Sequence, residues 1–126
     1  MRPGTLAVVA QLTSQGASFD LCLANFLDDF YSAPAADALN VPTVLLRSSC
    51  GELGGVQDAY LAATAEHLAR AHGFPIPDWT AADAYKLHRP WFASPLAALR
   101  TVLLLESPVA FRTRNLFVSE NALSRV

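Results

Sequence analysis

The sequence predicts an all-α fold, a compact helical array of about five to seven helices in one domain spanning residues 1–126. Three observations support this fold class. Apolar residues recur at helical spacing, serine and threonine stand at the positions of helix N-caps, and the connections are short enough to place neighbouring helices side by side. A chain of 126 residues suits a single domain that buries roughly two-thirds of its unfolded surface.

The first two helices are predicted at the N-terminal end. Residues 6 to about 13 form a short helix that Thr5 can cap and that Gly16 closes. The next helix begins after Ser18, whose hydroxyl can accept an amide hydrogen bond. The negative charge of Asp20 interacts favourably with the dipole at the N-terminus of this helix. Its apolar positions follow the spacing i, i+3, i+4, i+7: Phe19, Cys22, Leu23, Phe26, Leu27 and Phe30.

The middle of the chain alternates between weak and strong helical patterns. Pro34 ends the second helix, and residues 33–55 give no clear pattern, with SSCGELGG (48–55) expected as a flexible loop. Residues 56–72 form an alanine-rich helix that another helix can approach closely, with Gly73 as its left-handed C-cap. After an extended, proline-containing stretch, Thr80 can cap a further short helix that runs through residue 87.

Residues 96–105 are predicted to form the central buried helix. Eight of these ten residues are apolar, and only Arg100 and Thr101 interrupt them. Such a segment suits a helix that is buried on most of its circumference. We therefore expect Leu99, Val102 and Leu103 in the core, with Trp91 and Phe92 as aromatic contacts at the start of this helix.

Two Ser-Pro pairs mark helix starts in the C-terminal part. In Ser94-Pro95 and Ser107-Pro108 the serine is expected as the N-cap and the proline as the first helical residue. A short helix of about 109–114 follows the second pair, and the chain then runs extended to a last turn capped by Ser119. No sheet is predicted.

Charged residues gather beside the most apolar segment. Residues 1–95 hold nine acidic and five basic side chains, whereas residues 96–126 hold four arginines and two glutamates. Glu106 is expected to pair with Arg112 or Arg114 and to fix the angle between two helices. Alternatively, the arginines face solvent and bind phosphate or an acidic surface. The candidate cluster is Arg100, Glu106, Arg112, Arg114 and Asn115.

Composition indicates a cytoplasmic protein with a protein partner or a homo-oligomeric state. Hydrophobic residues make up 52% of the chain and charged residues only 16%, below the roughly 25% of average domains. Excess apolar surface suggests a partner, although small alanines also explain the figure. Cys22 and Cys50 belong to no metal or redox motif and are expected as reduced thiols. Neither a secretory signal nor an apolar run of about 20 residues is present, so no membrane association is expected.

The residues that usually carry catalysis do not assemble into a motif. His67 and His72 are five positions apart, so they do not share a helix face as paired metal ligands would. No GxSxG or phosphate-binding glycine motif occurs. We therefore expect no enzyme activity, no metal and no cofactor. One lysine and four C-terminal arginines are few for a nucleic-acid surface, so a DNA-binding regulatory protein that uses these arginines stays the alternative.

The C-terminal half resembles a known group of proteins. The run ESPVAFRTRNLFVSENALSRV (106–126), with AEHLARAHGFPIPDW (65–79) and RPWFASPLAALR (89–100), is similar to the ending of a widespread group of small uncharacterised bacterial proteins. The similarity extends from about residue 58 to the C-terminus. Members of that group often accompany nucleotidyltransferase-like proteins of the toxin–antitoxin kind. The resemblance implies a non-enzymatic accessory or antitoxin-like role and provides no catalytic residues.

Overall fold

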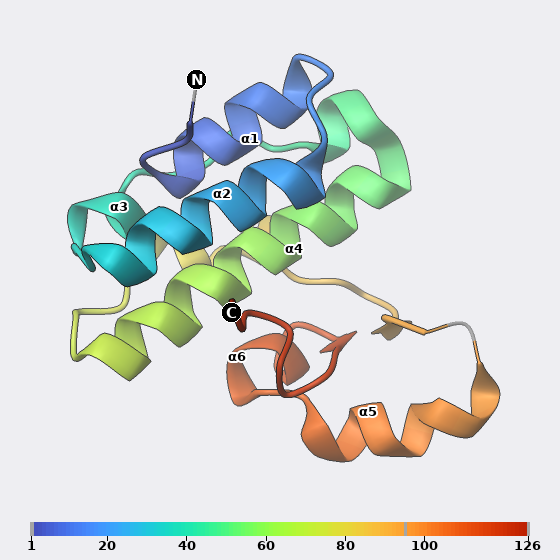
Figure 1. The fold of residues 1–126 in the computed structure, drawn as a ribbon. Helices are drawn as coiled ribbons and strands as arrows, with labels where there is room; N and C mark the ends of the chain where they lie inside the picture. Colours follow the sequence, from blue (N-terminus) through green and yellow to red (C-terminus); the bar gives the residue numbers. More distant parts are fainter. Residues whose placement is uncertain (1, 95, 126) are drawn as a thin grey trace.

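The computed structural model describes residues 2–94 and 96–125, and within them it contains six α-helices and two very short strands (Figure 1). The predicted all-α class is therefore confirmed. The elements, in chain order with three 3₁₀ turns left aside, are α1 (Leu6–Ser14), α2 (Phe19–Ser32), α3 (Asp37–Asn40), α4 (Arg47–His72), β1 (Trp91–Phe92), α5 (Arg100–Glu106), α6 (Val109–Arg112) and β2 (Leu116–Phe117).

The caps predicted for α1 and α2 are confirmed. The Thr5 hydroxyl accepts a hydrogen bond from the Val8 amide at 3.2 Å, and the Ser18 hydroxyl accepts one from the Leu21 amide at 3.3 Å. Both helices bury an apolar face, and on α2 it is the face that the spacing predicts. On α2 the buried residues are Cys22, Leu23, Phe26, Leu27 and Phe30.

Helix α4 is the central element of the fold. Figure 1 shows it running diagonally across the molecule, with α2 over one side and the C-terminal segments below it. Small side chains let α1 and α6 pack closely against α4. The alanines along its length are almost completely buried: Ala59, Ala62, Ala63, Ala65 and Ala69. Its predicted C-cap is confirmed, since Gly73 has a φ of 72°.

The segment expected as a loop at residues 48–55 is helical instead. Arg47 to Cys50 form one helical turn, and Gly51, with a φ of 65°, makes a kink before the long part of α4. The buried carboxylate of Asp58 accepts hydrogen bonds from the amides of Leu46 at 2.7 Å and Arg47 at 3.1 Å, which caps this turn. A cap supplied from a residue eleven positions downstream has no local sequence pattern, so the turn was missed.

A helix capped by Thr80 and running through residue 87 does not form. Two 3₁₀ turns, Asp78–Ala81 and Asp83–Tyr85, occupy this stretch. They allow Trp79 to donate a hydrogen bond to the Leu39 carbonyl at 2.9 Å and Tyr85 to donate one to the Thr43 carbonyl at 2.8 Å. These long-range bonds outweigh the local helical preference.

The C-terminal part contains a parallel strand pair that was not predicted. Trp91 pairs with Leu116 and Phe92 with Phe117. Helix α6 packs against α4, whereas α5 packs mainly on β2 and lies at the lower edge of the molecule in Figure 1, far from α1. Residues 96–105 are therefore not the central helix of the core.

The two Ser-Pro pairs behave differently. The Ser94 hydroxyl accepts from the Leu96 amide at 3.2 Å, while Pro95 lies outside the described residues. Ser107 does not cap α6, contrary to the prediction. Its hydroxyl accepts from the Val118 amide at 2.8 Å and lies 2.6 Å from the Leu103 carbonyl. Ser107 thus ties the end of α5 to the segment after β2.

Candidate functional site

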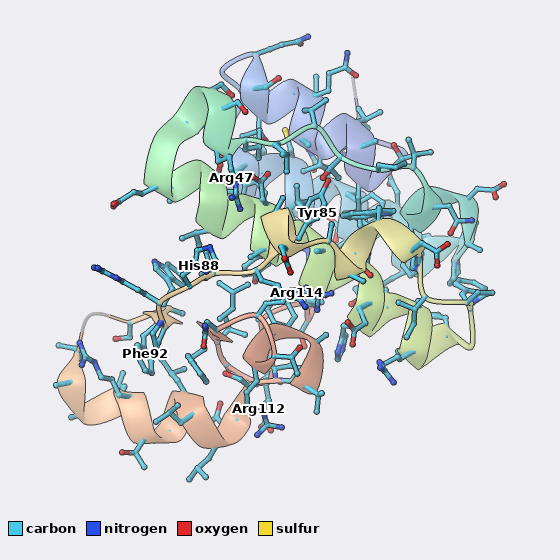
Figure 2. All side chains as sticks on the ribbon, turned by 180° about the vertical axis from the view of Figure 1, so that it is seen from behind. Arg47, Tyr85, His88, Phe92, Arg112 and Arg114 are labelled. Carbon is cyan, nitrogen blue, oxygen red and sulfur yellow. The ribbon has the colours of Figure 1, made fainter. Side chains whose placement is uncertain are left out.

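Arg114 is buried, although it was predicted as a member of a charged cluster that could face solvent (Figure 2). The residue as a whole is 3% exposed. Nη1 donates to Glu66 Oε1 at 2.9 Å and to the Ala110 carbonyl at 2.7 Å, and Nη2 donates to the Thr80 carbonyl at 2.8 Å. Arg114 thereby fastens α4, α6 and the first 3₁₀ turn to one another.

The predicted pair between Glu106 and Arg112 or Arg114 is wrong. The carboxylate that neutralises Arg114 comes from Glu66 on α4. Glu106 instead accepts a long hydrogen bond, 3.4 Å, from the Glu120 amide. Arg112 is exposed at the edge of α6, and it forms no ion pair within residues 2–94 and 96–125 (Figure 2).

Glu66 stays ionised between two arginines. Burial acts to raise the pKa of Glu66, but the hydrogen bond and charge of Arg114, with those of Arg70, bring this pKa below its ordinary value. Arg70 Nε lies 3.1 Å from Glu66 Oε2. Since Glu66 and Arg114 are 48 positions apart, no sequence spacing signals their pairing. The cluster holds the helices together, and Arg114 Nε is buried without a hydrogen-bond partner among the described residues.

The remaining predicted site residues lie near the C-terminal strand pair. Asn115 has a φ of 62° and its Nδ2 donates to the Leu87 carbonyl at 2.7 Å, so it turns the chain between α6 and β2. The Phe92 ring stacks on Phe117 with centroids 5.0 Å apart, and the Arg100 guanidinium lies 5.2 Å from the Phe92 ring centroid. The predicted cluster is thus divided between the interior and the edge of the molecule.

The most unusual surface is formed by residues 96–105, which we call the arm. Leu103 is buried, as predicted, but Leu99 and Val102 are exposed, contrary to the prediction. Apart from Leu103, every arm residue is exposed. Its large apolar side chains, between 41% and 78% exposed, are Leu96, Leu99, Val102, Leu104 and Leu105. Soluble domains rarely leave such a contiguous apolar surface uncovered.

The arm is held at its two ends. Phe92 and Phe117 stack where the chain leads into it, and Leu103 and Ser107 fix its far end against β2 and Val118. Between these points the side chains project outward. The apolar content predicted a helix that is buried on most of its circumference, but only Leu103 of the arm is buried.

A groove of about 640 Å³ opens between α2, the first half of α4, β1 and the C-terminal segment. This volume lies within the roughly 300–1,000 Å³ of ligand-binding clefts. Sequence reasoning missed it, because its walls come from four separate segments. Most of its walls are apolar, including Leu23, Leu27, Val56, Tyr60, Trp91 and Val118.

Polar groups without partners line the same groove. Gln57 Oε1 is buried and accepts no hydrogen bond from the described residues. Asp20 lines the groove and forms no ion pair within the described chain. Burial, followed by the negative charge of Asp20, raises the pKa of Tyr60 to about 12, so its hydroxyl stays neutral. The groove therefore combines an apolar lining with a few hydrogen-bonding groups.

His67 and His72 both lie on α4 and contact different aromatic rings, Phe111 for His67 and Phe30 for His72. Burial, with the charge of His72 as a second cause, lowers the pKa of His67. The His72 ring packs against Phe30 and Phe74. In the described part of the chain, no group of three His, Cys, Asp or Glu side chains is arranged to hold a metal ion.

Comparisons with known proteins return no relative. Family models, curated proteins and solved structures were compared with this chain, and none of them matches it. Over residues 2–94 and 96–125, no helix has both the length and the apolar character needed to cross a bilayer.

Proposed function

We propose that this protein is a non-enzymatic protein-interaction module and that the arm is its docking element. The observation that carries the proposal is the exposure of a helical segment with eight apolar residues in ten, of which only Leu103 is buried. Each large apolar side chain that passes from water into an interface contributes up to about 1.5–3 kcal/mol. Covering the arm is therefore strongly favourable, and a partner that covers it gains this energy.

The shape and charge of the arm favour a protein groove over a lipid surface. A helix lying on a membrane needs a strongly charged face, whereas the arm has only Arg100 and Thr101 as polar side chains. A helix that is apolar around its circumference is suited to enclosure by other protein. Within this proposal the protein is cytoplasmic, and its partner is a nucleotidyltransferase-like protein for which it acts as an accessory or antitoxin-like protein.

The alternative, DNA binding by the C-terminal arginines, has less support. Arg114 is buried, and Arg125 donates to Asp28 Oδ1 at 2.8 Å. Only Arg100 and Arg112 of the C-terminal arginines remain without a carboxylate partner among the described residues. Two cations provide few of the phosphate contacts on which nucleic-acid affinity depends.

Affinity capture from the native cell tests the proposal with a matched pair of variants. Val102 in the arm and Val41 elsewhere are 44% and 50% exposed, so Val102→Glu and Val41→Glu place the same charge at comparable surface positions. We expect the wild type and Val41→Glu each to co-purify with a stoichiometric amount of one partner, which mass spectrometry identifies as a nucleotidyltransferase-like protein. Val102→Glu should lose it. Equal recovery with both variants, or nucleotide turnover by the purified chain, would refute the proposal.

A further inference from the structure

We infer that the arm of one molecule occupies the groove of a second copy, and that two copies exchange arms reciprocally about a two-fold axis. The inference rests on the proposed function, since it takes the arm to be a protein-docking element. It adds a specific receptor for the arm, and any other protein that binds the arm then competes with the second copy.

The apolar surfaces of the arm and the groove are complementary in form. The arm is a convex helical ridge with leucine and valine side chains on several sides. The groove is concave and lined by Leu23, Leu27, Val56 and Trp91. Its volume of about 640 Å³ is large enough to take several leucine side chains. A helix laid into an apolar groove is a recurrent mode of protein recognition.

The polar groups also match in kind. The groove offers the exposed Asp20 carboxylate, which forms no ion pair within the described chain. The only polar side chains of the arm, Arg100 and Thr101, are donors, and neither forms a hydrogen bond to a described residue. Because a guanidinium and a carboxylate form a charge-assisted hydrogen bond, pairing Arg100 with Asp20 favours this occupant over a purely apolar one.

The arm follows one wall of the groove directly in the chain. Trp91 and Ala93 line the groove, and the arm begins at Leu96. An interface related by a two-fold axis requires one self-complementary patch, and an adjacent ridge and groove provide it. The arm is not free to fill its own groove, because Leu103 is buried and Ser107 is hydrogen-bonded to Val118.

The combined surface has the size of a stable interface. The arm has ten residues and the groove is lined by seventeen others, which together match the roughly 20–30 residues that each partner contributes to a standard protein–protein interface.

Sedimentation of the full chain tests the inference. We expect the wild type to sediment as a dimer at about 100 µM and to dissociate on dilution. Val102→Glu in the arm and Leu53→Glu in the groove wall, where Leu53 is 60% exposed, should each weaken self-association by about tenfold or more. Val41→Glu should leave it unchanged. Leu105→Glu provides a second arm variant at the most exposed position of the arm, and circular dichroism verifies the helical content of each.

A mixture of variants provides the decisive step. A Val102→Glu chain has an intact groove and a Leu53→Glu chain has an intact arm, so a mixed dimer restores one of the two arm–groove contacts. We expect the mixture to associate more tightly than either variant alone. A monomeric wild type, a Leu53→Glu chain that associates normally, or a mixture that does not recover would each overturn the inference. The affinity-capture experiment with Val102→Glu and Val41→Glu tests the proposed function separately from self-association.

Discussion

Helix α4 and the arm are both rich in apolar residues, yet they occupy opposite environments. In α4, ten residues are buried, including Asp58 and Thr64. In the arm, where leucine and valine dominate, only Leu103 is buried. The more hydrophobic of the two helices is therefore the more exposed.

The difference shows that the size of the side chains, and not hydrophobicity alone, determines which helix takes the centre. Alanines such as Ala59 and Ala63 let neighbouring helices approach α4 closely. The bulky arm packs mainly on β2, and most of its leucine and valine side chains stay exposed.

The largest effect on stability is expected at the buried ion pair of Arg114 and Glu66. Arg114→Ala leaves the Glu66 carboxylate without its buried partner and should lower the free energy of unfolding by roughly 3–5 kcal/mol. Arg112→Ala, two positions away but exposed, should change it by less than about 0.5 kcal/mol. Urea unfolding of both variants, at concentrations where the chain is monomeric, measures the difference. Equal losses would contradict the assigned contacts.

A smaller loss is expected at the cap of α4. Asp58→Ala leaves the Leu46 and Arg47 amides without their charged acceptor and should cost about 2–3 kcal/mol. Exposed Asp83, which makes no side-chain hydrogen bond to a described residue, is the matched control, and Asp83→Ala should stay within about 0.5 kcal/mol. Thermal melts compare the two, and an unchanged melting temperature for Asp58→Ala would contradict the capping role.

The pH dependence of stability should report the ion pairs of Glu66. Its folded-state pKa is lowered from 4.5, so its contribution is present above that value and is lost as the pH falls through the folded pKa. Asp58 affects the pH dependence of stability in the opposite direction, since burial raises its pKa. Glu66→Gln should therefore flatten the acid side of the stability curve. Unfolding of wild type and variant from pH 7 to about pH 3 tests this, and parallel curves would contradict it.

Local patterns predicted most of the helices. Thr5 and Ser18 stand directly before apolar residues at helical spacing, and Gly73 stands where a left-handed C-cap is required, so all three caps were predictable. Structure that depends on contacts between distant residues was not predictable. The turn before Gly51 depends on Asp58, and the short turns that replace the predicted helix at Thr80 depend on side-chain bonds to Leu39 and Thr43.

The candidate site was only partly predictable for the same reason. The sequence identifies residues 96–105 as the most apolar segment. Composition indicates how much surface favours burial, but it does not indicate whether the same chain or another molecule covers that surface. Arg114 was selected with Arg112, although only one of them lies within reach of Glu66. The groove joins residues from Ser18 to Arg125, so no window of sequence contains it.

Leucine truncation within the arm tests most directly whether the arm is an exposed docking helix. Leu103 is 7% exposed and Leu105 is 78% exposed, so the same substitution compares the two environments in one element. By denaturant unfolding of the monomer, Leu103→Ala should cost about 2–5 kcal/mol, and Leu105→Ala less than about 0.5 kcal/mol. Comparable losses at both positions would show that the arm is packed inside the chain and would contradict the account.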